Sequence, residues 1–219
     1  ELLRHTAGAP PKVAILPTAA GQENVTSWIR DGIAHFTALG CEAYGVRALD
    51  RAGVEDAEHV AAIDAADLIY LSGGSPGYLV DTFRGSAIWA AIMRVWLRGG
   101  TLAGSSAGAM ALGEWTLVRR EGQSRGMPAH WDSGLNLLPE IGVIPHYDRF
   151  GVERTTARVA EAPPGLAVLG IDEDTVVLCT GGSVRVLGRG AVTVWRDGLS
   201  TRLEAGAELP ATLAPLPAI

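Results

Sequence analysis

The sequence predicts an α/β fold in three layers, with a mostly parallel sheet, helices on both of its faces and β-hairpins at the C-terminal end. Two observations lead to this prediction. Short apolar runs alternate with longer segments in which apolar residues recur every three or four positions, so buried strands alternate with amphipathic helices. Turns rich in glycine and serine follow several of these runs, as they do where buried parallel strands end.

The first half of the chain is expected to hold four strands and three helices. The strands are predicted at residues 12–18, 41–48, 68–71 and 101–103, and the helices at residues 24–39, 54–66 and 78–97, the last broken near Gly85. The first helix has a clear apolar face and is stopped by Gly40. The residues of that face are Val25, Trp28, Ile29, Ile33, Phe36 and Leu39.

After Leu112 the pattern changes. Residues 115–119 are expected to be extended, 120–133 to be a polar loop, 141–144 a strand that ends at Pro145-His146, and 149–161 a helix. Short β-rich runs follow at residues 166–169, 175–179, 183–187 and 191–195, separated by glycine-containing turns. They predict strands and hairpins that finish the same sheet. No repeat or linker is found in the sequence, so residues 1–219 are expected to form a single domain.

The composition excludes several classes of protein. Of 219 residues, 47% are hydrophobic and 19% are charged, which is typical of a globular protein. The formal net charge of −6 argues against nucleic acid or an anionic membrane as the partner, because both attract basic surfaces. The two cysteines, Cys41 and Cys179, lie in strand-like runs without metal-ligand spacing. We therefore expect no disulfide scaffold, no metal and no cofactor.

No apolar stretch reaches the length of about 20 residues that spans a bilayer. The N-terminus also lacks the basic-then-apolar pattern of a signal peptide. We therefore expect a cytoplasmic protein, although the start at Glu1 suggests trimming and leaves a removed leader open. A homodimer is an open possibility, because the apolar tail at residues 209–219 either covers a subunit face or packs on its own domain.

The segment Gly104-Ser105-Ser106-Ala107-Gly108 follows a predicted strand and precedes a helix-compatible stretch. It matches Gly-x-Ser-x-Gly, the nucleophile elbow, in which a tight turn strains the serine backbone and lifts the hydroxyl clear of the sheet. We therefore predict Ser106 as a nucleophile. Ser105 is the next candidate, but no glycine lies two residues from it on either side.

A nucleophilic serine needs a base and an acid that orients the base. Of the five histidines, His146 closes a predicted strand and so lies on the same sheet edge as Ser106; His130, in the polar loop, is the reserve. As the acid, Glu121 is favoured and Asp132 is the alternative. The acidic run at residues 172–174 is interpreted as a solvated turn.

An oxyanion hole is expected from the backbone N–H of Ala107 and from the Gly73-Gly74 loop after the third strand, where glycine lets the backbone approach substrate closely. That loop lacks the Gly-Lys-Ser/Thr ending of a phosphate-binding loop.

Taken together, these segments resemble the serine peptidase family that contains peptidase E (aspartyl dipeptidase) and cyanophycinase. The resemblance covers residues 68 to about 177. It rests on Leu-Ser-Gly-Gly-Ser-Pro, Gly-Ser-Ser-Ala-Gly-Ala-Met, Leu-Asn-Leu-Leu-Pro followed by Ile-Pro-His-Tyr, and Gly-Ile-Asp-Glu-Asp-Thr. It implies the class I glutamine amidotransferase-like fold, with serine in place of the amidotransferase cysteine, as one catalytic domain over residues 1–219.

The resemblance also implies roles for single residues. These are Ser106 as nucleophile, His146 as base, Gly74 and Ala107 as oxyanion donors, and Glu121 as the acid by its spacing from the serine. Family members bind an aspartyl carboxylate, for which Arg154 is the first choice here and Arg149 the second. Ser75-Pro76 stands where peptidase E has Asn-Thr, which makes Ser75 a substrate-facing residue and puts strict aspartyl specificity in doubt.

The function predicted is that of a serine exopeptidase or dipeptidase that hydrolyses short peptides through an acyl-enzyme, with aspartyl peptides as one candidate substrate class. A β-aspartyl peptidase like cyanophycinase is the close alternative. A non-catalytic protein on the same fold and another acyl hydrolase are further alternatives. The usual α/β-hydrolase has its histidine late in the chain, whereas no histidine lies beyond His146 here.

Overall fold

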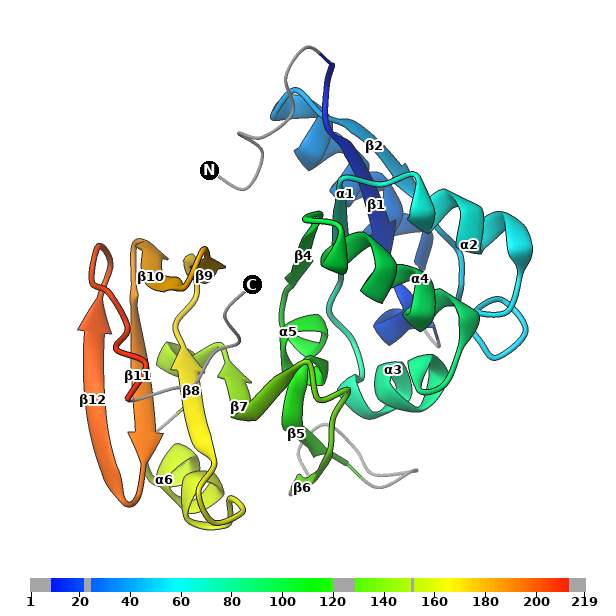
Figure 1. Ribbon diagram of the computed structural model, residues 1–219. Helices are drawn as coiled ribbons and strands as arrows, with labels where there is room; N and C mark the ends of the chain where they lie inside the picture. Colours follow the sequence, from blue (N-terminus) through cyan, green and yellow to red (C-terminus); the bar gives the residue numbers. More distant parts are fainter. Residues whose placement is uncertain (1–8, 22–24, 120–128, 151, 213–219) are drawn as a thin grey trace. The chain divides into compact units, whose positions relative to one another are not determined.

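The computed structural model describes residues 9–21, 25–119, 129–150 and 152–212, which fall into two compact units (Figure 1). The first unit is Glu1–Gly108 and the second is Ala109–Ile219. Each unit is described by itself, and the single domain over residues 1–219 stays a prediction.

The first unit contains a four-stranded parallel sheet in the order β2-β1-β3-β4. Its strands are β1 (Lys12–Leu16), β2 (Glu42–Gly45), β3 (Leu68–Leu71) and β4 (Thr101–Gly104). Its helices are η1 (Thr18–Ala20), α1 (Val25–Ala38), α2 (Ala57–Asp64), α3 (Pro76–Phe83) and α4 (Ala87–Leu97). The four predicted strands are therefore found. The helix predicted at 78–97 is two helices, because Ser86 starts a new one by accepting the Trp89 N–H at its hydroxyl.

Burial explains why this sheet forms. Four of the five residues of β1 are completely buried, as in a strand that is covered on both faces. On one face Val13, Ile15 and Leu68 pack against Ile33 and Phe36 of α1. In Figure 1, α1 lies on one side of the sheet and α2 and α4 lie on the other, which is the arrangement that right-handed crossovers produce.

The second unit contains a six-stranded sheet in the order β12-β11-β8-β7-β5-β6, and β9 and β10 form a separate two-stranded sheet. The bounds are β5 (Gly113–Val118), β6 (His130–Ser133), β7 (Leu138–Pro145), β8 (Ala167–Ile171), β9 (Thr175–Thr180), β10 (Ser183–Gly188), β11 (Ala191–Arg196) and β12 (Leu199–Glu204). The helices are η2 (Tyr147–Arg149) and α6 (Val152–Ala160), and α5 (Ala107–Ala111) runs across the boundary between the units. β7 is parallel to both of its neighbours, β5 and β8.

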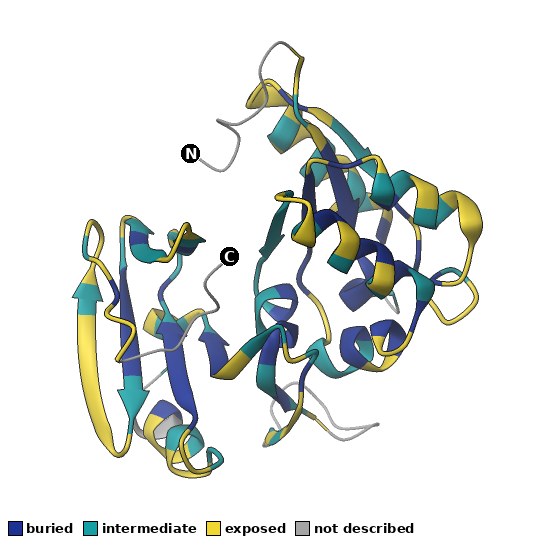
Figure 2. Ribbon diagram, in the orientation of Figure 1, coloured by how far each residue is buried: buried dark blue, intermediate teal, exposed yellow. Residues whose placement is uncertain are grey.

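Three expectations about this half of the chain were wrong. The strands after β8 do not all finish one sheet, because β9 and β10 pair only with each other. β6 lies within the predicted polar loop, and β12 was not expected. Both are edge strands whose residues are mostly exposed, as Figure 2 shows for β12, so neither carries the alternating apolar pattern that marks a half-buried strand.

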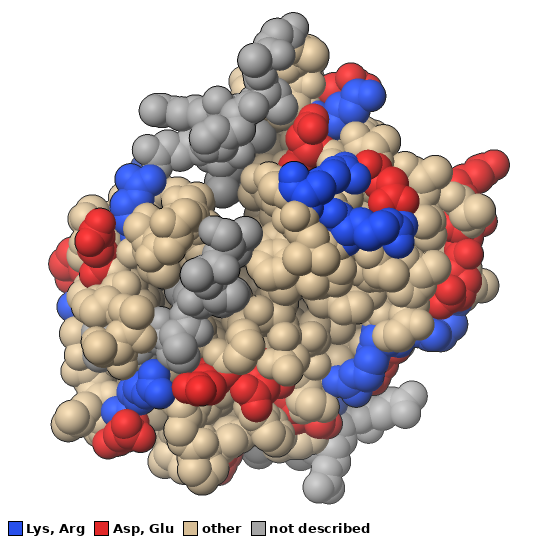
Figure 3. Space-filling model, viewed as in Figure 1, with Lys and Arg blue, Asp and Glu red and all other residues tan. Residues whose placement is uncertain are grey.

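The predicted fold class is confirmed as a mixed α/β fold whose central sheets are mostly parallel. Within the described residues no helix is long and apolar enough to cross a membrane. On the face drawn in Figure 3, basic side chains lie beside acidic ones and form no continuous basic surface among the residues described.

Candidate active site

The predicted elbow is a strained strand-to-helix turn in the first unit. β4 ends at Gly104 and α5 starts at Ala107, so two serines make the turn. The backbone φ of Ser106 is +50°, in the left-handed region that side chains other than glycine rarely adopt. Backbone strain of this kind persists only where the surrounding structure enforces it, and it gathers at functional sites. The local geometry is therefore the geometry expected of a nucleophile elbow.

The two serines of the turn have different surroundings. The hydroxyl of Ser105 lies 2.6 Å from Tyr70 Oη of β3, and its backbone N–H donates to the Leu71 carbonyl at 3.0 Å. Ser105 thus ties the turn to the neighbouring strand. Ser106 follows with its side chain beside the glycine loop, which favours Ser106 over Ser105 as the nucleophile.

Gly108 explains why the turn needs a glycine after the serine. A Cβ atom at Gly108 would lie 2.2 Å from the Leu71 carbonyl oxygen, so only glycine lets α5 begin this close to β3. The Gly108 N–H donates to the Ser105 carbonyl at 2.8 Å and closes the turn.

The loop after β3 reaches the same place. A Cβ atom on Gly73 would lie 3.3 Å from Ser106 Cβ, so the backbone of this loop runs directly alongside the elbow. Gly74 has a φ of +142° and leaves no room for a Cβ, which would lie 2.2 Å from the Ala19 carbonyl oxygen. Within the described residues, the N–H groups of Gly74 and Ala107 donate to no acceptor. Both N–H groups are therefore available for the predicted oxyanion role, which stays a prediction.

Ser75, predicted to face substrate, is exposed and has a structural task. Its hydroxyl accepts the Tyr78 N–H at 3.4 Å and so caps α3, and its own N–H donates to the Ala19 carbonyl at 2.7 Å. Contact with substrate stays a prediction for this residue.

In the second unit, His146 is held by a carboxylate. β7 and β8 are neighbouring parallel strands, with Pro145 opposite Ile171 in the register. Their carboxyl ends therefore lie at the same edge of the sheet, which brings His146 next to the acidic run that follows β8. Glu173 Oε1 lies 3.2 Å from His146 Nδ1. His146 itself is in the left-handed region, with φ of +53° and ψ of +38°.

Arg149 and Asp148 hold Glu173 in this position. Arg149 donates to Glu173 Oε2 from Nε at 2.9 Å and from Nη2 at 2.7 Å, and the Glu173 N–H donates to Asp148 Oδ1 at 2.9 Å. The hydrogen bond from Arg149, supported by that from His146, holds the pKa of the Glu173 carboxyl below its usual value. An ionised Glu173 favours the proton on His146 Nδ1, which leaves Nε2 as the acceptor that a general base needs.

Among the described residues, Glu173 is the carboxylate that holds His146, as the acid of a triad would. The acidic run at residues 172–174 was interpreted as a solvated turn. That interpretation was wrong for Asp172, which is buried, and it missed the contact between Glu173 and His146. Glu121 itself lies outside the described residues. Asp132, the alternative, accepts its hydrogen bonds from its neighbour Ser133. Recognition of residues 141–144 and 166–169 as adjacent parallel strands is the signal that would have found Glu173.

Other predicted residues fall as follows. Arg149, expected to bind substrate, has its guanidinium engaged by Glu173 and Asp148. Arg154 belongs to α6, but its side chain lies outside the described part. His130, the reserve base, pairs with Val118 as the first residue of β6.

Ser106 lies in the first unit and His146 in the second, so the pairing of Ser106 with His146 stays a prediction.

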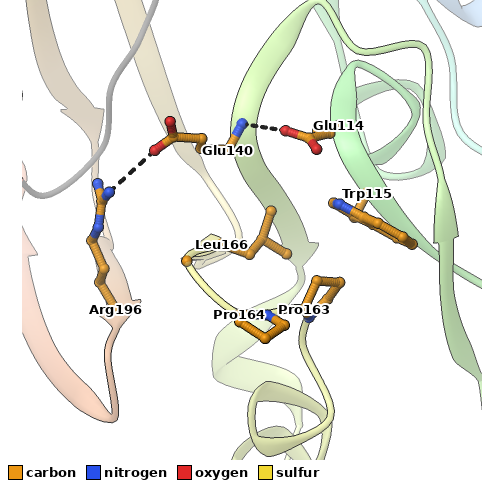
Figure 4. A pocket seen from close by; sticks show the side chains of 8 residues that line it. Glu114, Trp115, Glu140, Pro163, Pro164, Leu166 and Arg196 are labelled. Atoms are coloured by element: carbon orange, nitrogen blue, oxygen red, sulfur yellow. Dashed lines mark hydrogen bonds and ion pairs between the residues drawn. The ribbon is translucent and has the colours of Figure 1, made fainter.

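A separate pocket of about 330 Å³ lies within the second unit (Figure 4). Its walls are partly apolar, from Trp115, the two prolines and Leu166, and partly charged. Glu140 pairs with Arg196 at 3.1 Å, and the Glu140 N–H donates to Glu114 at 2.7 Å. The lining residues are Glu114, Trp115, Glu140, Pro163, Pro164, Gly165, Leu166 and Arg196. They include neither His146 nor Glu173, so this pocket is distinct from the histidine–carboxylate pair. No group of three or more His, Cys, Asp or Glu side chains suited to a metal occurs among the described residues.

A serine in a strained strand-to-helix turn and a histidine held by a carboxylate are the residue set of a serine hydrolase. Comparison with known proteins narrows this class. The model of peptidase family S51 matches residues 1–187. The chain therefore belongs to peptidase family S51, and the predicted family resemblance is confirmed.

Individual proteins that are similar to this chain are consistent with this family assignment. A cyanophycinase of Synechococcus elongatus is 29% identical over 204 residues, which cover 87% of this chain and 60% of that protein. A cyanophycinase of Nostoc sp. strain PCC 7120 is 31% identical over 192 residues, covering 83% and 62%. The chain thus spans about 60% of the length of these curated relatives. The crystal structure of a peptidase from an acI-B1 Actinobacterium superposes with a TM-score of 0.80 at 32% identity, covering 92% of this chain and 84% of that one.

Proposed function

We propose that this protein is a serine peptidase that cleaves short peptides through an acyl-enzyme on Ser106. His146 is the general base and Glu173 is the acid that orients it. The observation that carries the proposal is the backbone of Ser106, a serine with a φ of +50° between a parallel strand and a helix. The pair formed by His146 and Glu173 in the other unit supports it independently.

The proposed reaction has two stages. In the first, Ser106 Oγ attacks the peptide carbonyl while His146 Nε2 takes the hydroxyl proton, and the N–H groups of Gly74 and Ala107 stabilise the oxyanion. The imidazolium then gives its proton to the leaving amine, and the acyl-enzyme remains. In the second stage, a water molecule attacks the ester with His146 again as base, which releases the acid product and regenerates Ser106.

The preferred substrates within this proposal are dipeptides and other short peptides, with an aspartyl residue as one candidate for recognition. Arg149 is engaged by Glu173, so Arg154 stays the first choice for a substrate carboxylate. Cleavage of β-aspartyl peptides is the second candidate function. It is favoured by the relatives, since the similar curated proteins from Synechococcus elongatus and Nostoc are cyanophycinases.

A peptide panel tests the proposal and separates its two forms. Wild type, Ser106→Ala and Ser105→Ala are incubated with aspartyl dipeptides, β-aspartyl-arginine and neutral dipeptides, and the products are separated by chromatography. We expect wild type to cleave some members and Ser106→Ala to lose at least about 10⁴-fold in kcat. Ser105→Ala is expected to keep far more activity than Ser106→Ala, because the Ser105 hydroxyl is engaged by Tyr70 and supports the turn without attacking substrate.

The cleavage pattern distinguishes the two candidate functions from each other and from failure of the proposal. Cleavage of aspartyl dipeptides alone supports the dipeptidase, and cleavage of β-aspartyl-arginine alone supports the second candidate. If the wild-type protein cleaves nothing, or Ser106→Ala cleaves as fast as wild type, Ser106 is not a peptidase nucleophile and the proposal fails.

A further inference from the structure

Trp28 of α1 lies beside the nucleophile elbow. A Cβ atom placed on Gly73 would meet Trp28 Cη2 at 3.4 Å, Ser106 Cβ at 3.3 Å and Ser106 Oγ at 3.7 Å. The tip of the indole and the Ser106 hydroxyl therefore border the same small space. The space beside Gly73 is so narrow that a methyl group there would already be in tight contact with both residues.

Trp28 is also exposed where the sequence predicts burial. The helical spacing assigns it to the apolar face of α1, but 38% of its surface is accessible. The packing of α1 on the sheet comes from Ile33 and Phe36 instead. Leaving an indole open to water forgoes the burial that stabilises most tryptophans in folded proteins. The exposure of the Trp28 ring beside Ser106 is therefore better explained by contact with a ligand than by packing within the fold.

The loop between Trp28 and Ser106 is held firmly. The Ser72 N–H donates to the Leu16 carbonyl at 3.1 Å, and the Ser75 N–H donates to the Ala19 carbonyl at 2.7 Å. These bonds fix both ends of the Gly73-Gly74 segment on β1 and η1. The space between the indole and the hydroxyl is thus set before any substrate arrives, which is the condition for selecting one side chain over another.

We propose that Trp28 is a specificity-determining residue, and that its indole is the wall against which a substrate side chain next to the cleaved bond packs. This inference rests on the proposed function, because it needs Ser106 to attack a peptide. An indole offers a large, flat apolar surface, and aromatic pairs prefer stacked or edge-to-face contact. The wall therefore selects leucine or phenylalanine over glycine or alanine.

The test compares Trp28→Ala and Trp28→Phe with wild type on matched peptides. Each residue flanking the cleaved bond is varied in turn through Gly, Ala, Leu and Phe, and kcat and KM are measured separately. We expect Trp28→Ala to lower kcat/KM about tenfold for the Leu and Phe peptides, mainly through KM, and less than about twofold for the Gly and Ala peptides. Trp28→Phe is expected to keep most of the preference. Leu39→Ala, which alters an exposed apolar residue just beyond the C-terminal end of α1, is expected to match wild type.

Two results would overturn the inference. If Trp28→Ala loses the same activity on all four peptides, Trp28 only supports the fold, and thermal unfolding of the variant should then show a loss of stability. If the preference for Leu and Phe peptides is unchanged, Trp28 has no part in substrate selection. If wild type cleaves no peptide, the proposed function fails. Wild type and Trp28→Ala are then compared by the rates at which a methyl and a phenylethyl fluorophosphonate label Ser106. A phenylethyl preference that Trp28→Ala removes supports the inference; equal rates, or no labelling of Ser106, overturn it.

Discussion

Glu173 Oε1 lies 3.2 Å from His146 Nδ1, and the two residues follow adjacent parallel strands of the same sheet. The other carboxylate oxygen of Glu173 accepts from Arg149, so one side chain bridges the histidine and a guanidinium. The Glu173 carboxylate cannot turn away from the His146 imidazole without breaking its hydrogen bonds to Arg149. The arrangement orients His146 and favours the proton on its Nδ1, which is what the acid of a serine-hydrolase triad does.

Replacing Glu173 tests that role. Glu173→Gln keeps the shape of the side chain but removes its charge, so it no longer favours the proton on His146 Nδ1. We expect kcat/KM to fall by about 10²- to 10⁴-fold in peptide hydrolysis. The control is Asp174→Asn, the next residue, which is exposed and has a φ of +54° that asparagine tolerates. If Glu121→Gln costs more activity than Glu173→Gln, the acid is Glu121 instead.

Arg149 is expected to control the ionisation of Glu173. Its hydrogen bond is the largest cause of the lowered pKa of Glu173, so Arg149→Gln raises that pKa toward the ordinary value. A carboxyl with a depressed pKa in the folded state stabilises the protein above the unfolded-state pKa, and that stability is lost as the pH falls through the folded-state pKa.

The difference in unfolding free energy between wild type and Arg149→Gln should therefore be largest near neutral pH and shrink on acidification below about pH 4.5. Urea unfolding between pH 3 and 7 measures it. The exposed Arg189, 3.9 Å from Asp174, provides the control as Arg189→Gln, for which a pH-independent difference is expected. A difference for Arg149→Gln that is the same at every pH would show that Arg149 does not act through Glu173.

Gly73 and Gly74 are expected to respond differently to an added methyl group. A Cβ atom on Gly73 fits with shifts of a few tenths of an ångström but occupies the space in front of Ser106, so Gly73→Ala should stay folded and lose about 10²-fold in kcat/KM. Gly74→Ala should lose more than about 2 kcal/mol of stability, because its φ is +142° and its Cβ would collide with Ala19. Thermal unfolding and hydrolysis rates are measured on both. Equal activity of Gly73→Ala and wild type would contradict the placement of substrate next to this loop.

Asp172, next to Glu173, is expected to matter for stability. It is buried, and its Oδ2 accepts from the Ala191 N–H and from Arg202, each at 3.0 Å. Asp172→Ala leaves that buried N–H without its acceptor, which should cost about 1–3 kcal/mol in urea unfolding. Glu204→Ala, which removes the exposed partner of the same arginine, should cost less than about 0.5 kcal/mol. Similar costs for the two variants would show that Asp172 is not a structural tie.

Thiol reagents are expected to leave the activity intact. Cys41 is buried, and burial raises the pKa of Cys179 to about 11, so few thiolates are present at neutral pH. A fluorophosphonate, by contrast, should inactivate the protein and label Ser106. Rapid inactivation by iodoacetamide at pH 7, with modification of either cysteine by mass spectrometry, would argue against a serine mechanism.

Local sequence patterns were sufficient for much of the fold. The strands β1 and β3 of the first unit could be predicted because each is a short apolar run that is mostly buried. The elbow could be predicted because a glycine must follow the serine in so tight a turn. Edge strands such as β6 and β12 could not be predicted. Both faces of such a strand are mostly exposed, so its sequence needs few apolar residues and shows no periodic pattern.

The sequence by itself therefore determined the alternating α/β plan, the serine of the elbow and the histidine at the end of a strand. Only the tertiary structure decided that Glu173 is the partner of His146 and that Trp28 lies beside Gly73. Both decisions depend on which elements become neighbours: β7 pairs with β8, and α1 carries its first turn to the loop after β3. Such pairings bring together residues far apart in the chain, and no local spacing of residue types records them.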